Sequence, residues 1–126
     1  NQFLTEVRGT ENWSGSKFTN AQNMFNGCLN LTCLDFSNSD FSDVTNLNNF
    51  VFNCPMLSSF KAPSNIKVSI GNFTASTLLT ADDLMTLING LSTVSTTQTL
   101  TIGAANLAKL TAEQIKIATD KNWTVV

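Results

Sequence analysis

The sequence predicts an α/β fold, a solenoid whose successive coils stack to form a parallel β-sheet. Two observations predict it. Residues 1–63 contain an internal repeat with a period of about 26 residues, typical of short and irregular coils. Residues 64–126 contain two helix patterns, each followed by a strand pattern, which are typical of larger coils that cap a solenoid. The chain length suits a single domain, 1–126, and Pro63 marks a change of coil type rather than a linker.

The repeat is visible when segment 23–36 is laid over segment 49–62. Apolar residues then lie over apolar residues throughout, and cysteine lies over cysteine. With one residue of slippage, Leu4 joins Leu31 and Leu57 at the start of three L-x-x-[LVF] copies. Because one such coil cannot bury its apolar edge alone, the coils stack and their short strands pair in parallel. This pattern is that of a leucine-rich-repeat-like solenoid.

Strands are expected over residues 32–36 and 58–62, where alternation divides the side chains between an inner and an outer face. Leu34 and Phe36 point inward, and the outer face is the candidate binding surface. It consists of Glu6, Arg8, Cys33, Asp35, Ser59 and Lys61. Stacking places three of its charged members in a column of alternating sign, and its cysteine is expected to be the most reactive thiol. The other side of each coil is expected to bury a phenylalanine-rich spine of Phe18, Met24, Phe25, Val44, Phe50 and Phe52.

Two helix starts stand out in the second half of the chain. Thr80 is expected to be an N-cap, with Asp83 near the positive end of the helix dipole. Thr111 and Gln114 have the spacing of a capping box. The residues expected to end these helices, in a left-handed conformation where glycine is usual, are Gly90 and Asn122.

The strand pattern continues after each helix. Strands are expected over 99–102 and 123–126, as members of the same parallel sheet as the earlier strands. A further strand is expected over 67–70, where apolar residues alternate, and a loop over the Ser- and Thr-rich segment 92–98.

Composition and charge exclude several classes of function. The chain has no histidine, so Ser-His-Asp and Cys-His catalysis and His-containing zinc sites are excluded. We therefore expect no enzyme, no metal and no cofactor. Nine acidic against seven basic residues give a net charge of −2, which argues against nucleic-acid binding. No apolar run is long enough to cross a bilayer, so no membrane insertion is expected.

Two groups of residues leave alternatives open. Cys28 and Cys54 occupy equivalent repeat positions and are expected inside as small apolar residues, with a disulfide between them as the alternative. Asp35, Asp40 and Asp43 are expected to satisfy backbone donors in tight turns. Calcium binding is the alternative for these carboxylates, although the loop pattern of an EF-hand is absent.

Residues 23–38, with V-T-N at 44–46, resemble the repeats of BspA-like leucine-rich surface proteins of bacteria. The motif that carries the resemblance is N-M-F-N-G-C-x-N-L-T-x-L-D-F-S-N. The segment from residue 78 onward is similar to C-terminal segments found on such proteins, including some from bacteriophage genomes. The resemblance implies a secreted or surface-anchored scaffold, with adhesion as the function proposed for some members.

Three functions follow as expectations. The first is a non-enzymatic module, extracellular or at the cell surface, that recognises a host or matrix protein or glycan. The second is a structural or host-attachment component of a phage particle, which would place the chain in a virion. The third is a repeat cap that has no ligand of its own and stacks on neighbouring repeats of a longer chain.

Overall fold

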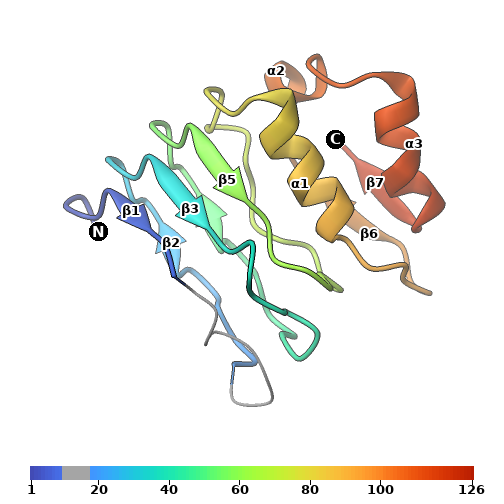
Figure 1. Cartoon of the computed structure of the whole chain (residues 1–126), viewed down its shortest axis with the longest axis horizontal. Helices are drawn as coiled ribbons and strands as arrows, with labels where there is room; N and C mark the ends of the chain where they lie inside the picture. The colour runs from blue at the N-terminus through green and yellow to red at the C-terminus, as the bar shows by residue number, and fades with distance from the viewer. Residues whose placement is uncertain (10–17) are drawn as a thin grey trace.

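The computed structural model describes residues 1–9 and 18–126 and shows a mixed α/β protein (Figure 1). Over these residues the secondary structure comprises three small parallel sheets and three helices. The elements lie on two faces with the apolar core between them. We call the face that carries β1, β3 and β5 the first face, and the face that carries β2 and β4 the second face.

The first face begins with a three-stranded parallel sheet in the order β1-β3-β5. Its strands are β1 (Glu6–Val7), β3 (Cys33–Asp35) and β5 (Ser59–Lys61). Glu6 pairs with Cys33, and Cys33 pairs with Ser59. These are the partners that the repeat alignment predicts. The predicted register, including its single residue of slippage, is therefore confirmed, although β3 and β5 are each shorter than predicted.

The second face begins with β2 (Phe25–Asn26) and β4 (Val51–Phe52), which the sequence did not predict as strands. They pair in parallel, with Phe25 opposite Val51, which is the register of the repeat alignment. Segment 71–73 lies next to β4, since the Asn72 amide donates to the Val51 carbonyl at 2.7 Å. Beyond it, the Phe73 amide donates to the carbonyl of Thr101 at 3.0 Å.

The last two strands, β6 (Gln98–Leu100) and β7 (Trp123–Val125), form a separate parallel pair. The prediction that they continue the sheet of β3 and β5 is wrong. They lie behind the helices, in line with β2 and β4 on the second face (Figure 1). The physical reason is that helices occupy the positions next to β5 on the first face.

Helix α1 (Ala81–Gly90) lies next to β5, and α3 (Ala112–Asp120) packs against α1. Two α1 side chains replace the strand partner that β5 lacks. The Asp83 carboxylate accepts from the Phe60 amide at 3.2 Å, and the Thr86 hydroxyl accepts from the Ala62 amide at 3.2 Å. A helix can therefore succeed a strand here without leaving edge donors unpaired.

The predicted helix starts are confirmed. Capping boxes form at Thr80 with Asp83 and at Thr111 with Gln114. At the other ends, Asn122 adopts the expected left-handed conformation, with φ of 68°. The expectation for Gly90 is wrong, because α1 includes it and Leu91 follows in an extended conformation. A side chain at Gly90 would collide with the Pro63 carbonyl oxygen, so the glycine permits close packing rather than a reversal.

The strand predicted over 67–70 is also wrong. Ile66 and Ile70 are buried, which explains the apolar pattern, but residues 67–70 form no strand, and the isolated bridge nearby joins Ile66, before the segment, to Leu91. Residues 92–97 lie outside helices and strands, as expected, whereas Gln98 already belongs to β6. A further short helix, α2 (Ala104–Leu107), precedes α3 and was not predicted.

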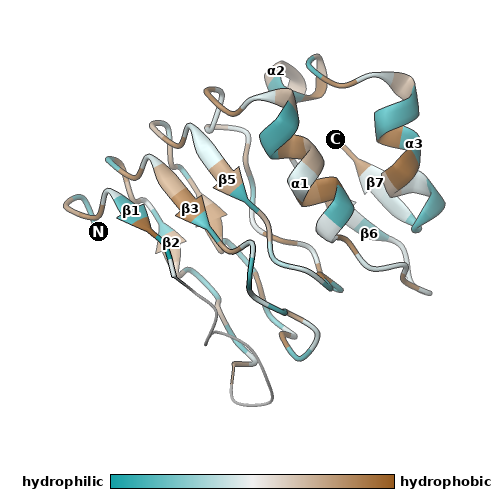
Figure 2. Cartoon of the chain, viewed as in Figure 1, coloured by the Kyte–Doolittle hydropathy of each residue, from teal (hydrophilic) through white to brown (hydrophobic). Residues whose placement is uncertain are grey.

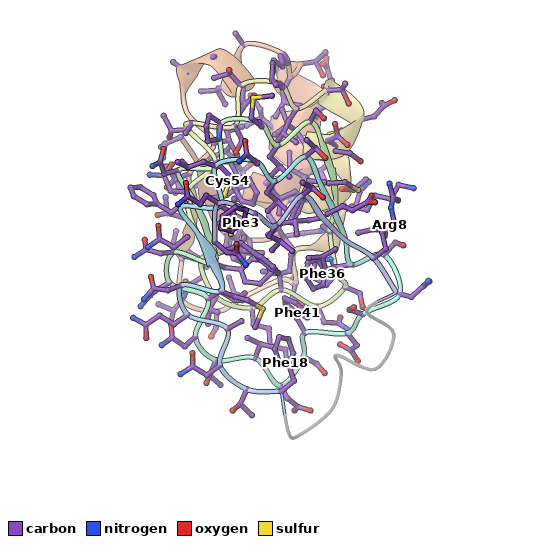
Figure 3. All side chains as sticks on the ribbon, turned by 90° about the vertical axis from the view of Figure 1, so that its left-hand side faces the viewer. Phe3, Arg8, Phe18, Phe36, Phe41 and Cys54 are labelled. Atoms are coloured by element: carbon purple, nitrogen blue, oxygen red, sulfur yellow. The ribbon has the colours of Figure 1, made fainter. Side chains whose placement is uncertain are left out.

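The core is a continuous apolar cluster between the two faces. Leu31 and Leu57 are fully buried, and Leu4 is half-buried against them. Five phenylalanine rings meet edge to face at centroid distances of 5.2–6.0 Å. They are Phe18, Phe25, Phe36, Phe41 and Phe50. Figure 3 shows three of these rings in the interior and Arg8 projecting from one side.

Two members of the predicted spine lie outside the core. Met24 is 37% exposed and Phe52 is 42% exposed, so their predicted burial is wrong. The pairing explains Phe52: it stands opposite Asn26, while its buried neighbour Val51 stands opposite Phe25. Hydrophilic and hydrophobic residues both occur along α1 and α3 (Figure 2). Helix α1 buries Leu84, Leu87 and Ile88, whereas Ile117 of α3 is exposed.

Candidate functional site

The structure brings four predicted site residues together on the first face. Glu6 and Arg8 are exposed and form an ion pair, with Arg8 Nε 2.9 Å from a Glu6 carboxylate oxygen. Asp35 and Lys61 are direct neighbours in the ladder between β3 and β5. Asp35 is half-buried and Lys61 is exposed. We call Glu6, Arg8, Asp35 and Lys61 the charged row.

For two members of the row, Asp35 and Arg8, hydrogen bonds shift the pKa more than Coulomb attraction does. Bonds from the Ser37 hydroxyl and amide, at 2.7 and 3.0 Å, lower the pKa of Asp35, with smaller contributions from Lys61 and Arg8. The bond to the Glu6 carboxylate raises the pKa of Arg8. Both groups stay ionised near neutral pH, so the row offers alternating charges to a partner.

The remaining two predicted site residues, Cys33 and Ser59, are less exposed to solvent than the charged row as a whole. Cys33 is buried, only 6% exposed, although it remains the most exposed of the three cysteines. This burial argues against the reactive thiol that the sequence predicts at this position. It lies in the central strand, paired with Glu6 on one side and Ser59 on the other, and the flanking strands cover its small side chain. Ser59 is half-buried.

The other cysteines are buried as expected. Cys28 and Cys54 are free thiols, so the disulfide alternative does not hold. The Cys54 thiol donates to the Phe25 carbonyl at 3.0 Å, and burial raises its pKa. A thiol that is protonated and enclosed is a poor nucleophile.

Of the three aspartates expected to satisfy turns, Asp35 and Asp40 do so, whereas Asp43 makes no such hydrogen bond among the described residues. Asp35 accepts from the amide of Ser37, and Asp40 accepts from that of Ser42 at 2.9 Å. Asn65 donates a further bond to Asp40 at 2.9 Å, and this bond is the main reason that the pKa of Asp40 is lowered. Within residues 1–9 and 18–126, no three acidic, cysteine or histidine side chains gather as a metal site would require.

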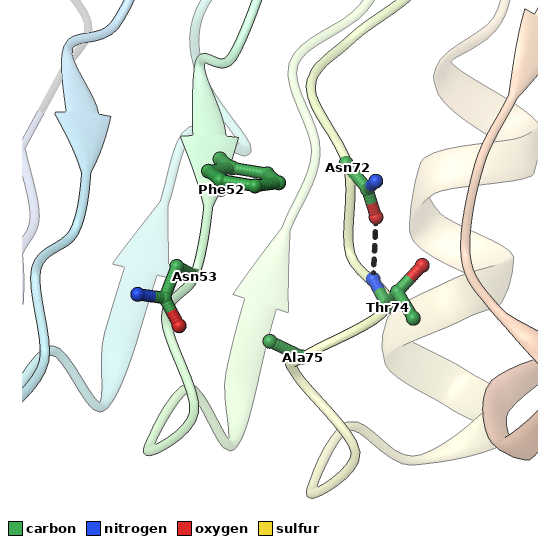
Figure 4. A pocket seen from close by; sticks show the side chains of 5 residues that line it. All are labelled: Phe52, Asn53, Asn72, Thr74 and Ala75. Atoms are coloured by element: carbon green, nitrogen blue, oxygen red, sulfur yellow. Dashed lines mark hydrogen bonds between the residues drawn. The ribbon is translucent and has the colours of Figure 1, made fainter.

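The structure also shows an open hollow on the second face that sequence reasoning missed (Figure 4). Its volume is about 400 Å³, and its lining residues are Phe52, Asn53, Asn72, Thr74 and Ala75. We call it the second-face hollow. The charge pattern was the available signal, because the chain has no charged residue from 44 to 60 or from 68 to 81.

No helix among the described residues has the length and apolar character that crossing a membrane requires. Comparison with protein-family models, with curated proteins and with solved structures finds no match for the chain.

Proposed function

We propose that the chain is a non-enzymatic recognition module of a leucine-rich-repeat-like solenoid, and that its first face binds a host or matrix macromolecule. The parallel pairing of Glu6 with Cys33 and of Cys33 with Ser59, at the spacing of the sequence repeat, supports the solenoid. The resemblance to BspA-like repeats supports a location outside the cell or at its surface. No cofactor is needed for such a role.

The charged row is the observation that carries this proposal. It stands on a three-stranded parallel sheet whose inner side chains, Leu34 and Phe60, are fully buried. A rigid support reduces the entropy that a binding surface loses when it meets a partner. The row holds two positive and two negative side chains, so it favours a partner with matching charges over a uniformly acidic or basic one.

The row is small, so the affinity of one copy is expected to be weak. Strong attachment then requires several copies that bind together, in a longer array or on one particle. This expectation agrees with a surface protein that acts through repeated modules.

An array of extracellular-matrix proteins and glycans tests the proposal. The variant combines Arg8→Glu, Asp35→Lys and Lys61→Glu, and the proposal expects it to lose binding while its circular dichroism spectrum stays unchanged. The control exchanges the exposed ion pair of α3, Lys116→Glu with Asp120→Lys. Equal loss in the control, or full binding by the row variant, contradicts the proposal.

A second candidate function is structural: a repeat cap or a phage particle component that stacks on further repeats. One observation favours it. Among the described residues, β1 pairs on one side only, and Leu4 and Val7 remain half-buried where Leu31 and Leu34 are fully buried. This partly open apolar edge suits another repeat. Tail and capsid genes next to the coding sequence would favour the particle component.

A further inference from the structure

We propose that the second-face hollow binds an uncharged saccharide, with Phe52 as the stacking platform and amide side chains as hydrogen-bonding groups. The hollow lies on the opposite face from the charged row, so this site does not depend on the first-face proposal (Figure 1). Three properties of the hollow carry the argument: an exposed ring, free polar groups and the absence of charge.

The first property is the exposed aromatic ring of Phe52. Phe52 is 42% exposed although its neighbour Val51 is fully buried. In Figure 4 the ring lies above Asn53 and extends toward the segment that carries Asn72 and Thr74. The face of an aromatic ring carries partial negative charge, and it attracts the partially positive C–H bonds on the flat side of a sugar ring.

The polar groups surround this ring. The Asn72 side-chain oxygen accepts from the Thr74 amide at 2.9 Å, which fixes the side chain and leaves its NH2 group to donate outward. Asn53 is exposed, and within the described residues its side chain makes no hydrogen bond. Amides both donate and accept, as the hydroxyl groups of sugars do, so these residues match a polyhydroxylated ligand.

The absence of charged residues around the hollow indicates a neutral ligand. None of the five lining residues is charged, and neither is any residue of β2, β4 or segment 71–73. An ionic ligand would lose hydration here and gain no counter-charge, whereas a neutral one loses less. A volume of about 400 Å³ lies within the usual range of small-ligand sites, and it suits sugar units better than a folded protein surface.

The walls of the hollow are held in place before any ligand arrives. Gly71 has φ of 53°, and a side chain there would overlap the backbone of Val51, so only glycine permits this approach. The Asn72 amide then bonds the Val51 carbonyl at 2.7 Å. This contact fixes segment 71–73 next to β4, which reduces the cost of ordering the site on binding.

NMR titration of the ¹⁵N-labelled chain tests the proposal. The neutral probes are cellohexaose, maltohexaose and hexa-N-acetylchitohexaose, and the acidic probe is a heparin-derived hexasaccharide. We expect at least one neutral probe to shift the amide signals of the lining residues saturably. The proposal is overturned if no neutral probe does so up to about 10 mM, or if only the acidic probe binds there.

Two variants and two matched controls locate the binding. Phe52→Ala and Asn53→Gly should each weaken it by about tenfold. The glycine suits the backbone, because Asn53 has φ of 53° and Gly27 occupies the equivalent position one repeat earlier. The controls are Met56→Ala, which removes a comparably exposed apolar side chain, and Asn49→Gly, which removes an amide at the same φ.

Saccharide affinity that survives Phe52→Ala, or that falls equally in the controls, overturns the proposal. The charge-exchanged first-face variant should bind the saccharide normally. Its result therefore separates a failure of this site from a failure of the charged row.

Discussion

Asn106 is a buried polar side chain that joins separate segments in the second half of the chain. It belongs to α2 and is fully buried. Its amide nitrogen lies 3.2 Å from the carbonyl oxygen of Phe73, 3.1 Å from that of Ser76 and 3.0 Å from that of Ile102. Its oxygen accepts from the Lys109 ammonium at 2.9 Å. One side chain thus links the second face to the segment before α1.

The loss of stability expected for Asn106→Ala follows from these contacts. Each lost hydrogen bond costs about 1 kcal/mol, and a carbonyl left with no partner costs up to about 3 kcal/mol. The Phe73 carbonyl keeps the amide of Ser76 as a partner at 2.9 Å, so its loss is partial. We therefore expect the free energy of unfolding to fall by about 2–4 kcal/mol, with part of that from the space left behind.

Urea denaturation followed by circular dichroism measures this change. Asn106→Leu separates the two causes, because leucine restores the volume but donates no hydrogen bond. We expect it to recover less than half of the lost stability. Asn48→Ala, at an exposed asparagine, is the control and should change stability by less than about 0.5 kcal/mol. A loss under about 1 kcal/mol for Asn106→Ala, or wild-type stability for Asn106→Leu, refutes the reasoning.

Three further predictions concern other parts of the fold. Gly90→Ala, which usually stabilises a helix, should instead destabilise the protein by about 2 kcal/mol in urea denaturation, because its side chain meets the Pro63 carbonyl. Hydrogen bonding that lowers the pKa of Asp40 in the folded protein contributes stability above the ordinary aspartate pKa, and this contribution is lost as the pH falls through the lowered value. Asn65→Gly should therefore raise the pKa of Asp40 in an NMR titration; an unchanged value contradicts this cause. Cys33 should react with iodoacetamide only after unfolding, and rapid labelling of the native protein would show that its burial is wrong.

The repeat and the helix caps were predictable because each depends on short-range pattern. The alignment that placed Cys28 over Cys54 also gave the register of β2 with β4, although neither segment was predicted as a strand. The N-cap at Thr80 and the capping box at Thr111 needed only residues three apart. Both features can be predicted because they follow from the sequence pattern itself, without knowledge of how the chain folds back on itself.

The errors arose where packing, rather than the local pattern of residues, decides the outcome. Alternation correctly placed Leu34 inside, but it could not show that flanking strands cover Cys33. Phe52 was assigned to the core on its apolarity alone, although its own strand already buries Val51. Gly90 was interpreted from its place near a helix end, whereas the deciding contact comes from Pro63.

The same distinction applies to the candidate sites, of which the charged row was predicted and the second-face hollow was missed. The ladder placed Asp35 beside Lys61, as the repeat predicted. The second-face hollow was missed because it forms where β4 meets segment 71–73, and the approach of these two depends on Gly71 rather than on a repeated motif. A left-handed glycine that touches a distant backbone has no periodic signature in the sequence.

The two faces differ in the element that lies next to their last strand, and they differ in the charge that they carry. On the first face, Asp83 and Thr86 satisfy the edge of β5, so helices with charged surfaces can follow the sheet. On the second face, backbone pairing continues from β4 through segment 71–73 toward β6. Those strands stay short and carry no charge. The charged side chains therefore lie on the first face, which suits a charged partner, and the second face, which lacks them, suits a neutral ligand.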